Sequence, residues 1–564
     1  MAAPPASAAS LPAAGVARRG VRRWGRSGAR GGGGLLAIPA CLVATFAVLP
    51  LVYIFLRAGQ AGLESYLQRV FSATTFELLT NTLLLMAGVV ALSLALALPL
   101  AWLVSRTDLP GRRLWAVLGA LPLVFPSYVA AFALVAVLGP RGYLQGWLAP
   151  LGIERLPDLA YGYPGALLAL GLFTYPYIYL LVVAALERID PALEESSRAL
   201  GRGRWESFFR VILPQLRPAL VGGGLLVALY VLSDFGAVSI VRFPTFTLSI
   251  YSAYQSLFDR SVAAALATVL VATSLGVLAL EAWLLRRSRP LPPRPSRPAP
   301  MLRLGRWRWP ALLFTTSLAM LTLVLPLGVV TFWGLRGLWL GRSLGSAGQA
   351  AVNSLGTSAA AALVTVVLAL PVAAWAVRSG GRLPKVVERL ASAGFALPGL
   401  VIALSLVFFT SRFARPLYQT LAVLVAAYVV RFLPQALAAL RGSLLSVSPA
   451  LEEAGRSLGK NGLKVLSTIT VPLVRPGLVA GAALVFLTAL KELPATLLLR
   501  PIGFETLATR IWSTAAEGIY SEASLPALWL ILVSAPPVYA LIIRPSLEPR
   551  KSLGKDKSSG GLEA

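Results

Sequence analysis

The chain has 564 residues, of which 57% are hydrophobic and 13% are charged, with a mean hydropathy of +0.75. A soluble protein needs more charge to cover its surface, so this composition excludes a soluble domain and indicates a multi-span membrane protein. The net charge of +28 could suggest nucleic acid as a partner, but the basic residues gather in alternate loops, which is the positive-inside pattern of membrane proteins.

Apolar runs of roughly twenty residues, enough to cross a bilayer, recur along the chain and predict an all-α integral membrane fold with about twelve transmembrane helices. Residues 1–34 are rich in Gly and Arg, which predicts a disordered basic cytoplasmic tail held near anionic lipid. The chain has no histidine and a single cysteine, Cys41, so neither a His-based metal site nor a disulfide framework is expected. In the first half, residues 35–285, the predicted spans are 35–56, 77–104, 114–138, 164–186, 220–242 and 263–285.

Prolines inside these spans are compatible with membrane helices, because neighbouring helices re-satisfy the backbone groups that proline frees. Pro122, Pro126 and Pro398 are expected to mark kinks or breaks. Residues 286–309 alternate Pro and Arg, which favours an extended cytoplasmic linker over a docking site for a Pro-recognising domain.

The second half, residues 310–544, repeats the first in the same direction, and residues 545–564 are predicted to be a cytoplasmic tail. Equivalent prolines are 272 residues apart at Pro126/Pro398 but 258 apart at Pro176/Pro434, so the first half carries an insertion of 14 residues, placed in the external loop 139–163. Two parallel six-span repeats are therefore expected. The charge pattern places both chain termini in the cytoplasm.

One polar segment occurs twice between apolar runs, as residues 190–219 (the first loop) and 448–477 (the second loop). A proline after Asp or Ser favours a helix start, and glycine accepts the left-handed conformation that ends a helix. Each loop therefore predicts a cytoplasmic helix–turn–helix with exposed acids and bases. A solvated loop would explain one copy but not two with equal spacing, so both are interpreted as docking sites. The candidate docking residues are Glu194, Glu195, Arg198, Gly201 and Pro214 in the first loop and Glu452, Glu453, Arg456, Gly459 and Pro472 in the second.

Both loops resemble the EAA loop in the membrane subunits of ATP-binding-cassette importers. Ser196-Ser197 and Ala454-Gly455 stand where that motif has Ala-Ala. The resemblance covers nearly the whole chain except the tails and linker, and it implies the type I importer fold in a bacterial inner membrane. It also implies that each loop is a coupling helix seated on one of two copies of a cytoplasmic ATPase, and that an extracytoplasmic solute-binding protein is the other partner.

The chain has no G-x-x-x-x-G-K-[ST] segment, whose backbone cradles nucleotide phosphates. Its two Gly-Lys pairs, at Gly459 and Gly554, are followed by Asn and Asp. We therefore expect a non-catalytic translocation subunit that binds no cofactor itself, with ATP bound by the partner subunits.

Two further segments, residues 233–267 and 490–528, resemble the corresponding segments of ferric-iron permeases. They align with each other so that Asp234 falls opposite Glu492. By the helical rise, both acids lie about fifteen residues into predicted spans, near mid-bilayer, where a buried carboxylate is costly and marks function by default. The hypothesis is that Asp234 and Glu492, with Tyr230, line a translocation path, and that the two carboxylates are candidate contacts for a hard trivalent cation.

Several alternatives stay open. Lys491 or Arg431 could pair with these acids, so that the acids only hold helices together. The transported solute could be thiamine or another small solute, and the alternative of another class is a secondary transporter with parallel repeats.

External loops 139–163, 243–262 and 500–524 are the expected docking surface for a binding protein. Their acids are candidate contacts for basic patches on that partner: Glu154, Asp158, Asp259, Glu505, Glu517 and Glu522.

Overall fold

The computed structural model describes residues 33–60, 62–140, 142–151, 157–255, 260–286, 301–341 and 344–540. Predictions for the two tails, for most of the linker (287–300) and for Glu154 and Asp259 fall outside the described residues. Within the described ranges the chain is helical, with one isolated β-bridge. Eleven of its helices are long and apolar enough to cross a membrane, or twelve if Arg382–Ala396 and Gly399–Phe413, bent by 103°, form one span. The predicted span count is confirmed.

In the first half, five helices correspond to the predicted spans. They are α1 (Gly33–Gly59), α3 (Ala73–Arg106), α7 (Gly162–Leu186), α10 (Leu213–Ser233) and α13 (Arg260–Leu285). The predicted span 114–138 is broken into α4 (Arg112–Leu118), the 3-10 turn η1 (Leu121–Val124) and α5 (Ser127–Leu138). Pro122 lies in η1 and Pro126 caps α5, so both prolines mark breaks as expected.

The predicted span 220–242 is wrong at its C-terminal end. Helix α10 stops at Ser233, and Asp234 leaves the helix with a ψ of 130°. The short helices α11 (Gly236–Ile240) and α12 (Phe246–Gln255) follow. Asp234 therefore lies at a break between helices rather than inside one.

The second half repeats this plan. Its first span consists of α14 (Arg308–Ala319) and α15 (Leu325–Trp339), joined through the π-helical turn η5 (Met320–Val324). Pro398 stands at the N-cap of α18, at the bend between α17 and α18, as predicted. The remaining elements are α16 (Leu344–Arg378), α17 (Arg382–Ala391), α18 (Gly399–Phe413), α19 (Leu421–Ser446), α22 (Val471–Leu490), α23 (Pro494–Leu499), α24 (Leu507–Ala516) and α25 (Tyr520–Val538).

The two halves exchange their peripheral helices. One buried cluster joins α1, α12 and α13 of the first half to α16, α18, α19 and α22 of the second. The other joins α3, α5, α7 and α10 to α15, α24 and α25. Side-chain contacts fix the exchange: Ser405 Oγ in α18 donates to the Pro50 carbonyl in α1 at 2.6 Å, and Trp512 Nε1 in α24 donates to Ser239 Oγ in α11 at 2.7 Å. The sequence repeats are therefore not separate packing units.

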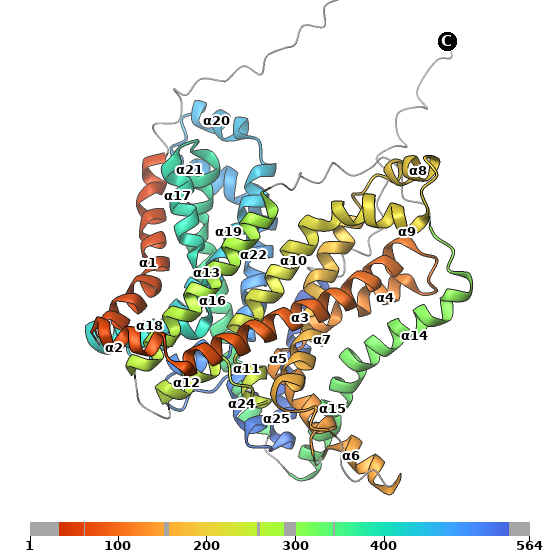
Figure 1. Cartoon of the computed structure of the whole chain (residues 1–564). Helices are drawn as coiled ribbons and strands as arrows, with labels where there is room; N and C mark the ends of the chain where they lie inside the picture. The colour runs from red at the N-terminus through yellow and green to blue at the C-terminus, as the bar shows by residue number, and fades with distance from the viewer. Residues whose placement is uncertain are drawn as a thin grey trace, which may run out of the picture.

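The loop helices α8 (Pro191–Ala199) and α20 (Pro449–Ser457) lie at the same end of the molecule, where α1 begins (Figure 1). Helices α6 (Tyr143–Leu148), α12 and α24 lie at the opposite end. Helix α6 belongs to the insertion of the first half, and its Tyr143 ring contacts the Phe332 ring of α15, with centroids 5.6 Å apart. The insertion thus packs against the first span of the second half.

The last residues of the linker are structured. In residues 301–304, the linker end, Leu302 N donates to the Arg106 carbonyl at 2.9 Å and the Leu302 carbonyl accepts from Asp108 N at 3.1 Å. Asp108 Oδ1 also accepts from Leu304 N at 2.8 Å. Gly305 begins a helical turn that leads into α14, so the predicted extended linker 286–309 is wrong from residue 305 onward.

Candidate functional site

Both loops form the predicted helix–turn–helix. Asp190 caps α8 by accepting from Ala192 N, and Ser448 caps α20 by accepting from Ala450 N. Gly201 and Gly459 follow the two helices with φ of 82° and 81°, a region that L-side chains rarely adopt. The chain reverses there because glycine alone reaches this conformation without strain.

Each loop then enters its next transmembrane helix through a π-helical turn. These turns, Phe208–Ile212 and Leu466–Thr470, precede α10 and α22. Pro214 and Pro472 occupy the second position of these two helices, where the missing N–H of proline is tolerated. The local patterns that the sequence suggested are therefore present in both copies.

The paired acids of each loop have different environments. Glu195 and Glu453 are exposed, as predicted. Glu452 is not exposed, and that prediction is wrong: only 4% of Glu452 is accessible. Its carboxylate accepts from Arg378 Nε and from Thr470 Oγ1, both at 3.0 Å. Glu452 therefore ties the second loop helix to the end of α16 and to its own π-helical turn.

The first loop has a related but weaker arrangement. Glu194 is half-buried and forms an ion pair with Arg198 at 2.5 Å. Arg106, the equivalent of Arg378, is buried and donates to the Leu186 carbonyl at 3.0 Å. Arg456 of the second loop approaches Glu452 at 3.7 Å. Arg198 and Arg456 pair with acids four residues away, whereas the partner of Arg378 could not be read from the sequence, because Arg378 and Glu452 lie 74 residues apart.

The centre of the molecule holds the two acids that the sequence analysis selected. Asp234 is buried at the break after α10. It accepts a hydrogen bond from Ser127 Oγ of α5 and one from Ala237 N at 2.9 Å, so its carboxylate binds the first turn of α11. Tyr230, one turn earlier, interacts with Asp234 and Ser127, which places this candidate residue beside the acid.

Glu492 lies at the equivalent break after α22, also buried. It forms an ion pair with Arg431 of α19, 3.0 Å from Nε to Oε2. Of the two pairings that the sequence left open, the one between Arg431 and Glu492 is present. Lys491 instead donates from Nζ to the Leu123 carbonyl at 2.7 Å, a bond that crosses from the second half to η1 of the first.

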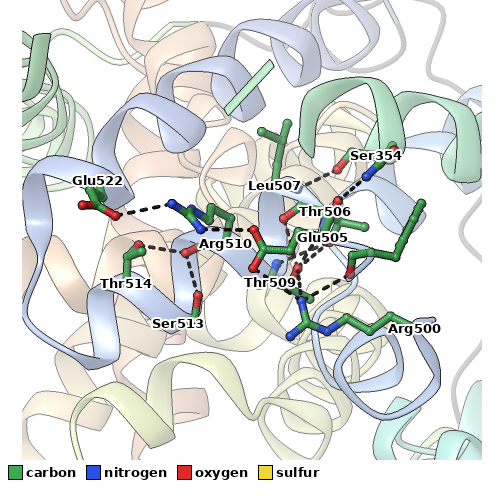
Figure 2. Close-up of polar contacts among 12 residues, drawn as sticks. Ser354, Arg500, Glu505, Thr506, Leu507, Thr509, Arg510, Ser513, Thr514 and Glu522 are labelled. Atoms are coloured by element: carbon green, nitrogen blue, oxygen red, sulfur yellow. Dashed lines mark hydrogen bonds and ion pairs between the residues drawn. The ribbon is translucent and has the colours of Figure 1, made fainter. Parts of the chain in front are cut away.

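The end of the molecule opposite the loop helices carries paired charges in the second half. Figure 2 shows Arg510 of α24 between Glu505 and Glu522, at 3.2 Å and 3.4 Å. Arg500 also approaches Glu505 at 3.8 Å. Two of the acids proposed to meet a basic partner are thus already paired with arginine, whereas Glu517 is exposed. A cavity of about 230 Å³ adjoins this network, lined by Gly334, Gly337, Leu338, Gly341, Ala347, Arg510, Ser521, Glu522, Leu525 and Pro526.

Comparison with known proteins agrees with this arrangement of two repeats. The family described as binding-protein-dependent transport system inner membrane component matches residues 96–290 and 365–544, one match in each half. Both matched regions contain a loop helix and a central acid.

Several transport permeases are similar to the chain. The Fe(3+)-transport system permease protein FbpB 2 of Haemophilus influenzae is 36% identical over 518 residues, which cover 90% of this chain and 96% of that protein. The ferric transport system permease protein FbpB of Actinobacillus pleuropneumoniae is 25% identical, covering 89% of this chain and 76% of that protein. The molybdenum transport system permease protein ModB of Escherichia coli is 33% identical but covers only 36% of this chain.

Proposed function

This chain belongs to the family of binding-protein-dependent transport system inner membrane components, and from that membership we propose that it is a permease for ferric iron. It is a multi-pass inner membrane protein and the non-catalytic membrane subunit of an ATP-binding-cassette transporter, with an ATPase and a binding protein as partners. The proposal that the substrate is ferric iron rests on the 36% identity, over 90% of this chain, to a Fe(3+)-transport permease.

The two loops are the proposed contacts with two ATPase copies. Two features support this: α8 and α20 lie at one end of the molecule, and Glu195 and Glu453 are exposed on them. In this proposal that end and both termini are cytoplasmic. ATP-driven closure of the ATPase pair moves the two loop helices, the halves rock, and a passage between the halves opens toward the binding protein.

The proposed path for the ion runs past Asp234, Tyr230 and Glu492. Both acids are buried at helix breaks, where backbone groups are freed from the helical hydrogen-bond ladder and face neighbouring residues instead. The ion pair with Arg431 balances Glu492 while no cation is present. Oxygen atoms at such a point suit a hard cation in transit.

The deciding experiment measures uptake into proteoliposomes that contain the permease and its ATPase, supplied with the binding protein. Labelled ferric iron should enter only with ATP, and labelled thiamine should not enter. Uptake of thiamine without uptake of iron would overturn the substrate. Ion-driven uptake with no ATPase co-purifying would instead favour a secondary transporter.

The path residues have their own test in the same system. Asp234→Asn and Glu492→Gln should each reduce iron uptake while the complex with the ATPase stays intact. Unchanged uptake in both variants would show that these acids only support the fold.

A further inference from the structure

Tyr128 has a buried hydroxyl without a hydrogen-bond partner among the described residues. The residue stands in the first turn of α5, directly after Ser127, and only 2% of it is exposed. Native proteins leave few buried hydroxyls unpaired, because each one gives up its bonds to water on folding. The loops and the contacts between the halves described above do not use this atom, so it needs another explanation.

Polar groups from both halves act electrostatically on this hydroxyl. It interacts electrostatically with Tyr230 of α10, with Tyr428 of α19 and with the Glu492 carboxylate. Tyr230 in turn interacts with Asp234. Tyr128 is therefore related electrostatically to Glu492 directly and to Asp234 through Tyr230.

Gly236, which follows the first helix break, packs against Tyr128 on one side and against the Leu493 side chain, which follows the second break, on the other. A Cβ placed on Gly236 would lie 2.9 Å from the Tyr128 Cβ and 3.2 Å from Leu493 Cδ2. Gly236 follows Asp234 by two residues and Leu493 directly follows Glu492. Tyr128 thus packs directly on the first break, and only Gly236 separates it from the Leu493 side chain of the second, while its hydroxyl has no hydrogen-bond partner among the described residues.

We propose that Tyr128 contacts the transported ion, and that its oxygen, with those of Tyr230, Asp234 and Glu492, forms a transient oxygen site for Fe(III) between the two halves. This inference rests on the proposed function. Fe(III) is a hard cation and prefers oxygen donors. On contact, the Tyr128 phenol releases its proton to water and the phenolate oxygen bonds the iron, with no change in oxidation state.

Weak binding is what a transport site requires, because the ion has to leave again. Among the described residues no group of three or more His, Cys, Asp or Glu could hold a metal ion. Arg431 neutralises Glu492 at 3.0 Å, which keeps the site from trapping a cation. A phenol adds an oxygen donor that carries no charge before the ion arrives, which explains why a tyrosine occupies this position.

The test compares wild type, Tyr128→Phe and Tyr179→Phe in the complete transporter. Tyr179 is a matched control: it is equally buried in the same half, but its hydroxyl donates to the Ala116 carbonyl at 3.1 Å. Phenylalanine keeps each ring and removes only the hydroxyl. Two quantities are measured: uptake of labelled ferric iron, and the visible phenolate-to-iron absorption of the purified permease on addition of ferric ion.

Tyr128→Phe should lower iron uptake about tenfold, at the low end of the loss for groups that support a metal site. It should abolish the absorption band and leave stimulation of the ATPase by the loaded binding protein unchanged, whereas Tyr179→Phe should resemble wild type. Wild-type uptake and an unchanged band in Tyr128→Phe would overturn the inference.

Two remaining outcomes are also decisive. If Tyr128→Phe fails to assemble with the ATPase, the absorption of the wild-type permease on addition of ferric ion becomes the deciding measurement. A phenolate-to-iron band in wild type supports the site, and the absence of this band overturns the inference. If wild type itself takes up another solute and no iron, the proposed function fails. Iron uptake that is insensitive to Tyr128→Phe refutes the tyrosine contact alone.

Discussion

Replacing Glu452 with glutamine should loosen the second loop helix without altering its exposed face. Glu452 is 4% exposed, and its carboxylate accepts hydrogen bonds from Arg378 Nε and Thr470 Oγ1, each at 3.0 Å. Glutamine keeps the shape and one acceptor oxygen. It removes the negative charge that balances Arg378, whose side chain is only 18% exposed.

The size of the effect follows from this burial. Removing one partner of a buried ion pair costs roughly 3–5 kcal/mol, and losing a hydrogen bond to a charged group costs roughly 1.5–3 kcal/mol. Arg378 keeps its bond to the Val447 carbonyl at 3.2 Å, and glutamine can still accept one bond. We therefore expect the lower range, about 2 kcal/mol, which corresponds to about a thirtyfold shift toward the undocked loop helix.

Hydrogen exchange of the α20 amides in the purified permease measures this shift. Glu453→Gln is the matched control, because it makes the same change one residue away on an exposed side chain. Exchange of α20 should accelerate about thirtyfold in Glu452→Gln and stay unchanged in Glu453→Gln, which should weaken co-purification of the ATPase instead. A double variant, Arg378→Met with Glu452→Met, should recover most of the loss, because no charge is then left unpaired. Equal α20 protection in wild type and Glu452→Gln would refute the argument.

Three further predictions concern other contacts. Gly459 has a φ of 81°, so Gly459→Ala should destabilise the second loop by about 1–2 kcal/mol in thermal unfolding. Gly462→Ala is the control and should have little effect, because Gly462 has an ordinary φ and its new Cβ would have no neighbour within 4 Å. Gly399→Ala should reduce thermal stability by roughly 1–3 kcal/mol and lower iron uptake, because its new Cβ would meet Glu492 Oε1 and lie 2.8 Å from Arg431 Nη1, and would so disturb both members of this ion pair. Unchanged stability and uptake would contradict this. Asp108→Ala removes the hydrogen bond to Leu304 N, which is worth about 1 kcal/mol, and should therefore speed amide exchange in the linker end by about fivefold. Exchange at the wild-type rate would show that this hydrogen bond does not hold the linker end.

Local features of this protein could be predicted from its sequence, because their causes are local. Asp190 and Ser448 cap helices in the structure, and Gly201 and Gly459 end them, as expected. Each effect depends on residues within one or two turns of the helix. The repeated loops were therefore predicted correctly in secondary structure, although the burial of Glu452 was not.

Long-range features could not be predicted in the same way. The partner of Glu452 comes from another transmembrane helix, and many arginines in the chain were equally plausible partners. The helix breaks at Asp234 and Glu492 had a signal that was missed, since Gly236 and Pro494 each follow an acid by two residues. The roles of these acids in transport stay a prediction.

Because the two halves exchange peripheral helices, these helices can reach their final packing only in a certain order during synthesis. Helix α1 is synthesised first, yet its packing partners α16, α17 and α18 emerge from the ribosome long after it. The bilayer can hold the apolar surface of α1 in the meantime, because lipid tails solvate such a surface as well as protein does. Final docking of α1 therefore has to wait for the second half. A chain truncated after the first half would leave this helix with its contacts to α13 but without those to α16, α17 and α18.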